Sequence, residues 1–333
     1  SVVVWNAKKS ELTLARDQLG VKPLHYMQVG NRVYFGSDYN SFFEQTYASI
    51  GFNQSALLSY LSFRYVVGTK TFYDKILDIS PGSYRLSSPD QSYNKVYWDI
   101  PTDIDDSDKG EDYYLSRLDY LLNQAVARQM MSDVPLGAFI SGGLDSSALI
   151  YFMSKTNLNI KSYIAGFDVK GYNEFEYADQ VAQHFNITPT KIHIDPDRFF
   201  ELTKDVIHYR GEPPSIPHEA AFLEMSRQMK KDITVVLSGE GADELFGGYG
   251  RIFRSPQDYY RSKFVGKGFP SMMSHFLSRY SWFNQSDKDA LLNPDLLKDG
   301  YFDEHSQEYL SGIFSKFNER EYFRAMYYVQ GKL

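Results

Sequence analysis

The sequence predicts an α/β protein in which a parallel-sheet domain follows an antiparallel α+β portion. In the first hundred residues, short runs of alternating polarity are broken by Gly, Asn and Asp, a pattern typical of antiparallel strands and hairpins. Beyond residue 112, apolar strand-like runs alternate with helix-like stretches, which indicates a parallel sheet covered by helices. An acidic segment with little to bury separates the two patterns.

The amino-terminal portion, residues 1–100, is predicted to be sheet with one helix. Val2-Val3-Val4 and the run Arg32-Val33-Tyr34-Phe35-Gly36 indicate strands, and a helix is expected near residues 54–63. We interpret residues 101–112 as a solvated linker and place the domain boundary there. The second domain is then expected to occupy residues 113–333.

The second domain begins with apolar residues at helical spacing between residues 115 and 125, which predict an amphipathic helix. Strands are expected at residues 136–140, 162–167, 191–194 and 233–237, and further helices at residues 146–154, 175–185 and 196–209. Parallel sheets of this kind bind ligands at the carboxyl ends of their strands. We therefore expect the site in the loops after Ile140, Phe167 and Leu237.

Composition excludes several classes of function. The 333-residue chain is 43% hydrophobic and 23% charged, as expected for a soluble globular protein. Its net charge is -7 and its basic residues are scattered, which excludes a nucleic-acid stripe. Because the chain has no cysteine, disulfides, thiolate metal sites and a cysteine nucleophile are excluded. No membrane-spanning stretch or signal peptide is evident, so we expect a cytoplasmic protein without a membrane partner.

The first chemical motif follows the predicted strand that ends at Ile140. It is Ser141-Gly142-Gly143-Leu144-Asp145-Ser146-Ser147, and it leads into a helix. The glycines permit close backbone approach, hydroxyl and amide groups can surround an anion at the helix N-terminus, and Asp145 can hold Mg²⁺. The spacing of a Walker loop is absent. A helix-capping turn is the alternative, but seven such residues between a strand and a helix favour a pyrophosphate cradle.

The second motif also follows an apolar strand. It is Ser238-Gly239-Glu240-Gly241-Ala242-Asp243-Glu244-Leu245-Phe246-Gly247-Gly248-Tyr249. Its three closely spaced carboxylates would repel one another unless a cation or a proton-transfer task offsets the repulsion. Asp243 is the candidate magnesium ligand and Glu240 the candidate general base. The alternative is a polar helix N-terminus, where the helix dipole favours acids.

Together the two loops resemble those of the N-type ATP pyrophosphatases, which have an adenine nucleotide α-hydrolase-like fold, and the second loop is similar to that of the asparagine synthetases. The amino-terminal portion resembles the closing half of the glutaminase domain of the same class II amidotransferase family, an Ntn-type α+β fold. The segments that carry this second resemblance are Ala15-Arg16-Asp17-Gln18-Leu19-Gly20-Val21-Lys22-Pro23-Leu24, Phe35-Gly36-Ser37-Asp38, Pro81-Gly82 and Tyr97-Trp98-Asp99.

The resemblance implies a ligase that amidates a carboxylate through an acyl-adenylate, with release of AMP and pyrophosphate. The implied substrates are aspartate and glutamine-derived ammonia, the implied cofactors are ATP and Mg²⁺, and a homodimer is expected. Glu240 is the implied catalytic base, and Asp145 and Asp243 are the implied metal ligands. The residues expected to bind ATP and pyrophosphate are Ile140, Ser141, Gly142, Gly143, Asp145, Ser146, Ser147, Ala165, Gly166, Ser238, Gly239 and Tyr249.

Two departures from the family pattern limit this interpretation. The family's glutaminase works through an amino-terminal cysteine and its synthetase domain extends far beyond the second loop, so we expect both ends of a longer protein to lie outside this sequence. The region of Pro213 to Glu219, in which His218 and Glu219 are candidate substrate contacts, departs from the Thr- and Arg-containing pattern of asparagine synthetases. Amidation of a sugar acid, closure of a lactam or peptide ring, and an inactive nucleotide-binding scaffold therefore remain alternatives.

Overall fold

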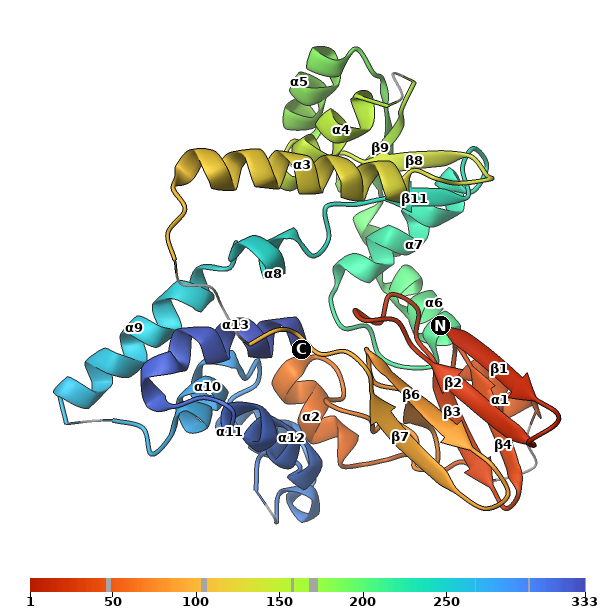
Figure 1. Cartoon of the computed structure of the whole chain (residues 1–333), viewed down its shortest axis with the longest axis vertical. Coiled ribbons are helices and arrows are strands. Elements are labelled where there is room, and N and C mark those ends of the chain that lie inside the picture. Colours follow the sequence, from red (N-terminus) through yellow and green to blue (C-terminus); the bar gives the residue numbers. More distant parts are fainter. Residues whose placement is uncertain are drawn as a thin grey trace. The chain divides into compact units, whose positions relative to one another are not determined.

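The computed structural model describes residues 1–45, 49–102, 107–156, 159–167, 173–266, 268–298 and 300–332 (Figure 1). The chain divides into two compact units. The first unit comprises Ser1–Asp103, His208–Ser215 and Tyr249–Leu333, and the second comprises Ile104–Ile207 and Ile216–Gly248. The first unit therefore collects segments that are distant in the sequence.

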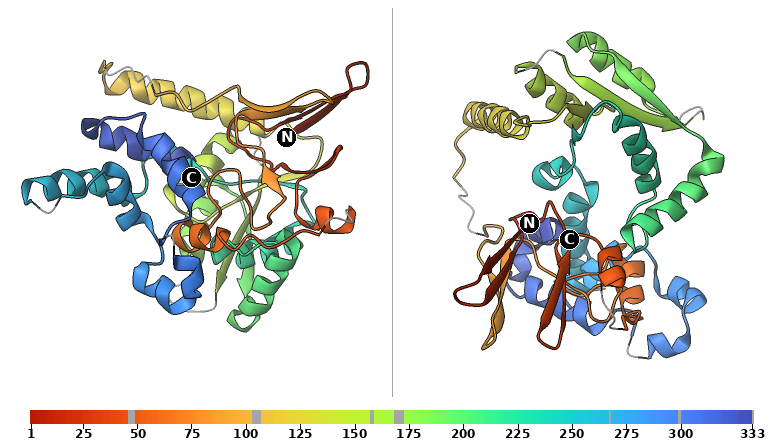
Figure 2. Two further views of the ribbon diagram at one scale, coloured as in Figure 1. Left: turned by 90° about the horizontal axis from the view of Figure 1, so that it is seen from below. Right: turned by 90° about the vertical axis from the view of Figure 1, so that its right-hand side faces the viewer.

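Two antiparallel sheets form the amino-terminal part of the first unit. One has the order β1-β2-β6-β7 and the other β4-β3-β5. Their bounds are β1 (Val2–Asn6), β2 (Glu11–Ala15), β3 (His25–Val29), β4 (Arg32–Gly36), β5 (Leu77–Asp78), β6 (Ser83–Ser87) and β7 (Ser92–Val96). Figure 2 shows the β1–β2 hairpin in dark red beside the orange strands. The predicted antiparallel portion is confirmed.

Helices make up the rest of the first unit. They are α1 (Asn40–Gln45), α2 (Ala56–Phe63), α9 (Gly250–Phe264), α10 (Met272–Tyr280), α11 (Gln285–Leu291), α12 (Glu304–Phe314) and α13 (Tyr322–Lys332), with 3-10 turns η2 (Pro294–Leu297) and η3 (Glu319–Glu321). Phe63 of α2 shares one buried core with Phe276 of α10 and Tyr322 of α13. A helix from the amino-terminal portion thus packs among the last helices of the chain.

Three of the four segments that resemble a glutaminase meet in one hydrogen-bonded cluster. The amide of Gly82 donates to the carbonyl of Asp17 (2.8 Å), and its own carbonyl accepts from the amide of Tyr97 (2.8 Å). The Tyr97 hydroxyl donates to the carbonyl of Arg16 (2.7 Å). Gly82 has φ +64°, and a side chain there would collide with the Trp98 carbonyl. In this structure these residues have a structural role.

The second unit contains a four-stranded parallel sheet of order β10-β9-β8-β11. Its strands are β8 (Leu136–Phe139), β9 (Lys161–Phe167), β10 (Pro189–Ile194) and β11 (Val235–Leu237). The helices that connect and follow them are α3 (Glu111–Gln129), α4 (Leu144–Ser154), α5 (Phe175–Phe185), α6 (Phe199–Arg210), α7 (His218–Met229) and α8 (Ala242–Phe246), with the 3-10 turn η1 (Pro196–Arg198). The predicted parallel α/β fold is confirmed.

Helices cover both faces of this sheet (Figure 1). Ile164 of β9 lies in a core with residues of α3, α4 and α5, whereas the neighbouring Tyr163 packs with Met225 and Met229 of α7. Successive strand residues point to opposite faces, so both sets of helices are anchored by one strand. This explains the nearly continuous apolar composition of the strands.

The strand order reverses between β8 and β11. From β8 the chain proceeds through β9 to β10 on one side, and it then returns to add β11 on the other side of β8. Such a switch point leaves a crevice at the carboxyl ends of the two strands, where ligands of open α/β sheets bind. The loops after β8 and β11 carry the two motifs.

Element boundaries differ from the predicted ones where local chemistry decides them. Helix α4 begins at Leu144, two residues earlier than predicted, directly after the paired glycines. The predicted helix from residue 196 begins as the turn η1, in which the Asp195 carboxylate accepts from the Asp197 amide (2.9 Å). Residues 168–172, in the loop after Phe167, and residues 103–106 of the predicted linker lie outside the described residues. Within the described part, no helix has the length and apolar character needed to cross a membrane.

Candidate functional site

The loop between β8 and α4, here called the cradle loop, is held in its conformation by hydrogen bonds of the serines of the motif. Ser141 and Ser146 share a hydroxyl–hydroxyl bond (2.9 Å), and the Ser141 hydroxyl accepts from the Gly143 amide (3.2 Å). The hydroxyls of Ser146 and Ser147 donate to the Gly143 carbonyl (3.2 and 2.7 Å). Ile140, which follows the strand, is 1% exposed and donates from its amide to the Tyr163 carbonyl (3.0 Å). The loop is therefore ordered by internal hydrogen bonds.

Gly142 allows this loop to approach α5 closely. Its φ is +81°, a left-handed conformation, and a Cβ there would collide with Tyr177 in the first turn of α5. Gly143 then precedes α4, whose 11 residues direct the positive end of the helix dipole toward the loop. Packing against Tyr177 therefore requires glycine at this position. The resulting loop leaves the helix N-terminus accessible to an anion.

The second loop leads from β11 into the short helix α8. The Ser238 hydroxyl accepts from the amide of Glu240 (3.4 Å), and Gly241 adopts φ +89°. Glu240 is exposed, whereas Asp243 is half-buried and its carboxylate lies against Gly248. The Gly248 amide donates to the Asp243 carbonyl (3.0 Å). The loop thus folds back on itself around Asp243 and leaves Glu240 accessible.

The two loops meet at Gly239. A Cβ on Gly239 would lie 3.0 Å from the Cβ of Asp145 and 3.3 Å from the amide nitrogen of Ser146. Only a residue without a side chain permits this approach without displacement of its neighbours. Since Leu237 pairs with Ala138 in neighbouring strands, the contact lies at the switch point of the sheet. The structure therefore brings the two predicted motifs together.

The acids of the two loops suit a phosphate-bound magnesium ion better than an all-protein metal site. Among the described residues, no group of three or more His, Cys, Asp or Glu side chains could hold a metal ion. Mg²⁺ at nucleotide sites is usually held by one or two carboxylates together with water and phosphate oxygens. The exposed carboxylate of Asp145, beside Gly239, fits such a donor set, and Asp243 is available on the adjoining loop.

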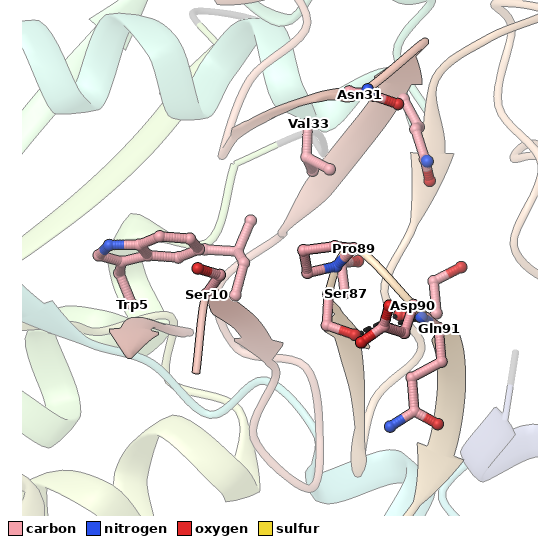
Figure 3. Close-up of a pocket in the computed structure, with 12 residues that line it drawn as sticks. Trp5, Ser10, Asn31, Val33, Ser87, Pro89, Asp90 and Gln91 are labelled. Atoms are coloured by element: carbon pink, nitrogen blue, oxygen red, sulfur yellow. Dashed lines mark hydrogen bonds between the residues drawn. The ribbon is translucent and has the colours of Figure 1, made fainter. Parts of the chain in front are cut away.

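A separate cavity of about 640 Å³ lies in the first unit (Figure 3). It is bounded by the turns and ends of the antiparallel strands, and its lining includes Trp5, Asn31 and Asp90. None of the residues predicted from the motifs lines it. The two loops of the parallel sheet therefore remain the candidate site.

Comparison with known proteins identifies the family of this chain. The family model described as asparagine synthase matches residues 117–330, and that of a glutamine amidotransferase domain matches residues 1–98. A Bacillus subtilis protein named asparagine synthetase (glutamine-hydrolysing) 1 is 32% identical over 275 residues, which cover 82% of this chain and 43% of that protein. The chain belongs to the asparagine synthase family.

Other relatives carry more than one kind of name. Asparagine synthetase (glutamine-hydrolysing) 3 of Bacillus subtilis is 27% identical over 81% of this chain and 45% of its own length. A protein named as an amidase from Gibberella zeae is 25% identical over 74% of this chain and 39% of its own length. This member of the asparagine synthase family thus spans less than half the length of these curated relatives.

Ala165 and Gly166, the two predicted nucleotide contacts on β9, have roles in packing in this family member. A Cβ on Gly166 would lie 2.7 Å from the ring of Phe175 and 2.9 Å from Asn173. Asn173 also donates to the Phe167 carbonyl (3.2 Å). Ala165 packs between the cores on the α6 and α7 side of the sheet. The space above Gly166 is therefore filled by protein, and binding of ATP through Ala165 and Gly166 stays a prediction.

The remaining predicted residues are more scattered. His218 is exposed as the first residue of α7, and Glu219 accepts from the Ile216 amide (3.3 Å), a local bond at the start of that helix. Tyr249 precedes α9 and belongs to the first unit. Sequence analysis missed Tyr177, which supports Gly142, because a tyrosine on an amphipathic helix gives no local signal of contact with a distant loop.

Proposed function

We propose that this chain contains the ATP-pyrophosphatase part of an enzyme that amidates a carboxylate through an acyl-adenylate. The observation that carries the proposal is the approach of Gly239 to Asp145 and Ser146, at the point where the strand order of the parallel sheet reverses. Membership of the asparagine synthase family supports the same assignment. As a whole, the protein is proposed to be a glutamine-hydrolysing ligase that acts in the cytoplasm as a homodimer.

The proposed reaction has two steps. A substrate carboxylate oxygen attacks the α-phosphorus of ATP, the bond from that phosphorus to the bridging oxygen breaks, and pyrophosphate leaves. Ammonia then attacks the acyl carbon, and AMP departs with the bonding electrons. Amides at the N-terminus of α4 and the serines of the cradle loop would bind the departing pyrophosphate.

Glu240 is the proposed general base for the second step. It is exposed on the loop that adjoins the cradle, so a substrate bound at the switch point can reach it. Asp145 and Asp243 are the proposed magnesium ligands. When bound, Mg²⁺ would supply charge stabilisation for the phosphate oxygens.

Aspartate is the proposed acceptor, with ammonia derived from glutamine. The asparagine synthetase relatives support aspartate. The relatives named as amidases favour a second candidate, which is the same adenylation applied to another carboxylate, such as a sugar acid or the acid of a lactam or peptide precursor. Both candidates use the same two loops.

ATP–pyrophosphate exchange with the intact protein and a panel of carboxylates tests the proposal. We expect Mg²⁺-dependent exchange with aspartate. Exchange with a different acid alone would retain the mechanism and replace the substrate. Absence of exchange with every acid, in a protein that still binds ATP, would contradict the proposal and favour a nucleotide-binding scaffold.

Two variants connect the exchange activity to the loops. Asp145→Asn removes the charge of the proposed ligand and should lower exchange by about 100-fold or more, while Gly239→Ala forces the loops apart and should lower it by roughly 10- to 100-fold. Asp179→Asn is the matched control, because Asp179 forms an exposed ion pair with Lys191 (2.6 Å) on the same unit. Equal activity of the control and both site variants would count against this site.

A further inference from the structure

The segment His208–Ser215 comprises the last residues of α6 and part of the loop before α7, and it packs in the first unit. The preceding residues, up to Ile207, and the following residues, from Ile216, belong to the second unit. The chain therefore leaves the parallel-sheet unit for eight residues and returns just before His218 and Glu219. Those two residues are the predicted contacts of the carboxylate substrate.

Side chains of the first unit hold the backbone of this segment. Three donors from three different places in the amino-terminal portion bind its carbonyl groups, so the path of the backbone is fixed at both ends and in the middle. The bonds are Asn40 Nδ2 to the carbonyls of His208 (2.8 Å) and Tyr209 (3.2 Å), the Tyr73 hydroxyl to Gly211, and the Tyr60 hydroxyl to Pro214 (2.8 Å).

Gly211 and Glu212 lie at the centre of the segment. Gly211 has φ +73°, and its Cβ position is 3.0 Å from the Cβ of Tyr39. The Glu212 carboxylate forms an ion pair with Arg210, and its side chain is 20% exposed. It is also close enough to the Tyr39 hydroxyl to accept a hydrogen bond. A carboxylate that is mostly removed from water needs such charged and hydrogen-bonding partners, because an unpaired buried charge destabilises the folded state.

The residues around Glu212 are themselves well packed. Tyr39 is 5% exposed, and its ring stacks on that of His25 with 4.3 Å between centroids. His25 pairs with Asp78, and the Tyr73 ring lies 5.2 Å from that of Tyr39. Burial raises the pKa of the Glu212 carboxyl group, against the opposing effect of Arg210. Glu212 is thus enclosed by charged and aromatic groups of the first unit.

We propose that Glu212 is a positioning residue for carboxylate recognition: its contacts with Arg210 and Tyr39 fix the His208–Ser215 segment and thereby the conformation of the residues that lead to His218 and Glu219. This proposal rests on the proposed function, since it deepens the assignment of the carboxylate site. Glu212 itself does not have to touch the substrate.

Kinetics of ATP–pyrophosphate exchange provide the first test. In Glu212→Ala we expect the KM for the carboxylate to rise by roughly 10-fold or more, since small displacements of binding groups have large effects, with the KM for ATP unchanged. Glu212→Gln keeps the shape and one acceptor oxygen, so it should recover most of the lost affinity. Glu201→Gln is the control, because Glu201 lies on α6 with a side chain 70% exposed. Equal loss of kcat with all substrates, or no change, would overturn the positioning role.

Amide hydrogen exchange supplies a second test that does not need activity. Glu212→Ala and Tyr73→Phe should both lose protection in residues 208–219, whereas protection in β8 and β9 stays at the wild-type level. Unchanged protection in residues 208–219 would refute the proposal even if the enzyme is active. If the wild-type protein shows no exchange of pyrophosphate with any acid, the proposed function fails. Loss of amide protection in Glu212→Ala would still show that Glu212 fixes the conformation of this segment.

Discussion

At the scale of single residues, the most unusual group is the amino group of Lys288. Lys288 is 1% exposed, although it lies on the polar helix α11. Its Nζ donates to the Ser62 hydroxyl (2.7 Å) and to the Tyr301 carbonyl (2.5 Å), and it lies 4.3 Å from the centroid of the Phe302 ring. Burial lowers its pKa to about 8, opposed by Asp303. Lys288 therefore ties α11 to α2 through polar contacts inside the core.

The lowered pKa of Lys288 predicts a specific dependence of stability on pH. Between pH 8 and 10.5 the unfolded chain keeps the lysine proton that the folded protein has released, so the free energy of unfolding should rise with pH. Lys288→Met should lack this rise, and the difference from wild type should grow by about 3 kcal/mol at most across the interval. Urea unfolding at pH 7, 8, 9 and 10 measures it.

Lys298→Met is the matched control for that series, because Lys298 has a side chain 71% exposed. Its unfolding free energy should follow the wild-type curve at every pH. A Lys288→Met curve parallel to wild type would show that the amino group titrates normally in the folded protein. This burial could not be predicted from the sequence, because a lysine between Asp287 and Asp289 fits a solvated helix surface.

At the scale of elements, two glycines differ in whether the packing around them requires a residue without a side chain. Gly312 lies in α12 with nothing within 4 Å of its Cβ position. Gly137 lies in β8, where a Cβ would be 2.7 Å from the Lys161 carbonyl and 2.9 Å from Ile233. A glycine in a helix or strand has a conformational cost, so only Gly137 is explained by the fold.

Alanine at these two glycines should therefore have opposite effects. Gly312→Ala should stabilise the protein by about 0.5–1 kcal/mol, because alanine is the better helix former and meets no neighbour. Gly137→Ala should destabilise it by roughly 1–3 kcal/mol through overpacking between β9 and Ile233. Thermal unfolding of both variants measures the difference. Two shifts of the same sign would contradict the packing around these positions.

Elements were predicted well where the pattern is local. The alternation of apolar strands with helices indicated β8 to β11, and helix α5 begins and ends at the predicted residues. Both chemical loops follow strands, as expected from the motifs. Boundaries were less well predicted at α4 and α6, where the glycines before Leu144 and the turn η1 decide the first helical residue.

At the scale of the whole molecule, the buried apolar clusters of one unit are separate from those of the other. Phe276 is fully buried among helices α2, α10, α12 and α13 in the first unit. Ile150 is fully buried between the sheet and the helices α3, α4 and α5 in the second. A chain with two cores need not unfold in a single two-state transition.

Scanning calorimetry of two core variants tests this organisation. Phe276→Ala and Ile150→Ala should each remove about 2–5 kcal/mol from the stability of the unit that contains the residue. We expect two unfolding transitions, with one variant lowering the midpoint of one transition and the other variant that of the second. A single transition lowered equally by both variants would mean that the two cores unfold together.

The fold class, the two loops and the family could be predicted from the sequence, because strand periodicity, helix periodicity and the spacing of a motif are all local properties of the chain. The position of β11 beside β8, which brings Gly239 against Asp145, is visible only in the folded structure. The same is true of the packing of His208–Ser215 and the last helices with the amino-terminal portion. Such contacts join residues far apart in sequence, and their stability depends on shape and hydrogen-bond geometry that no local pattern encodes.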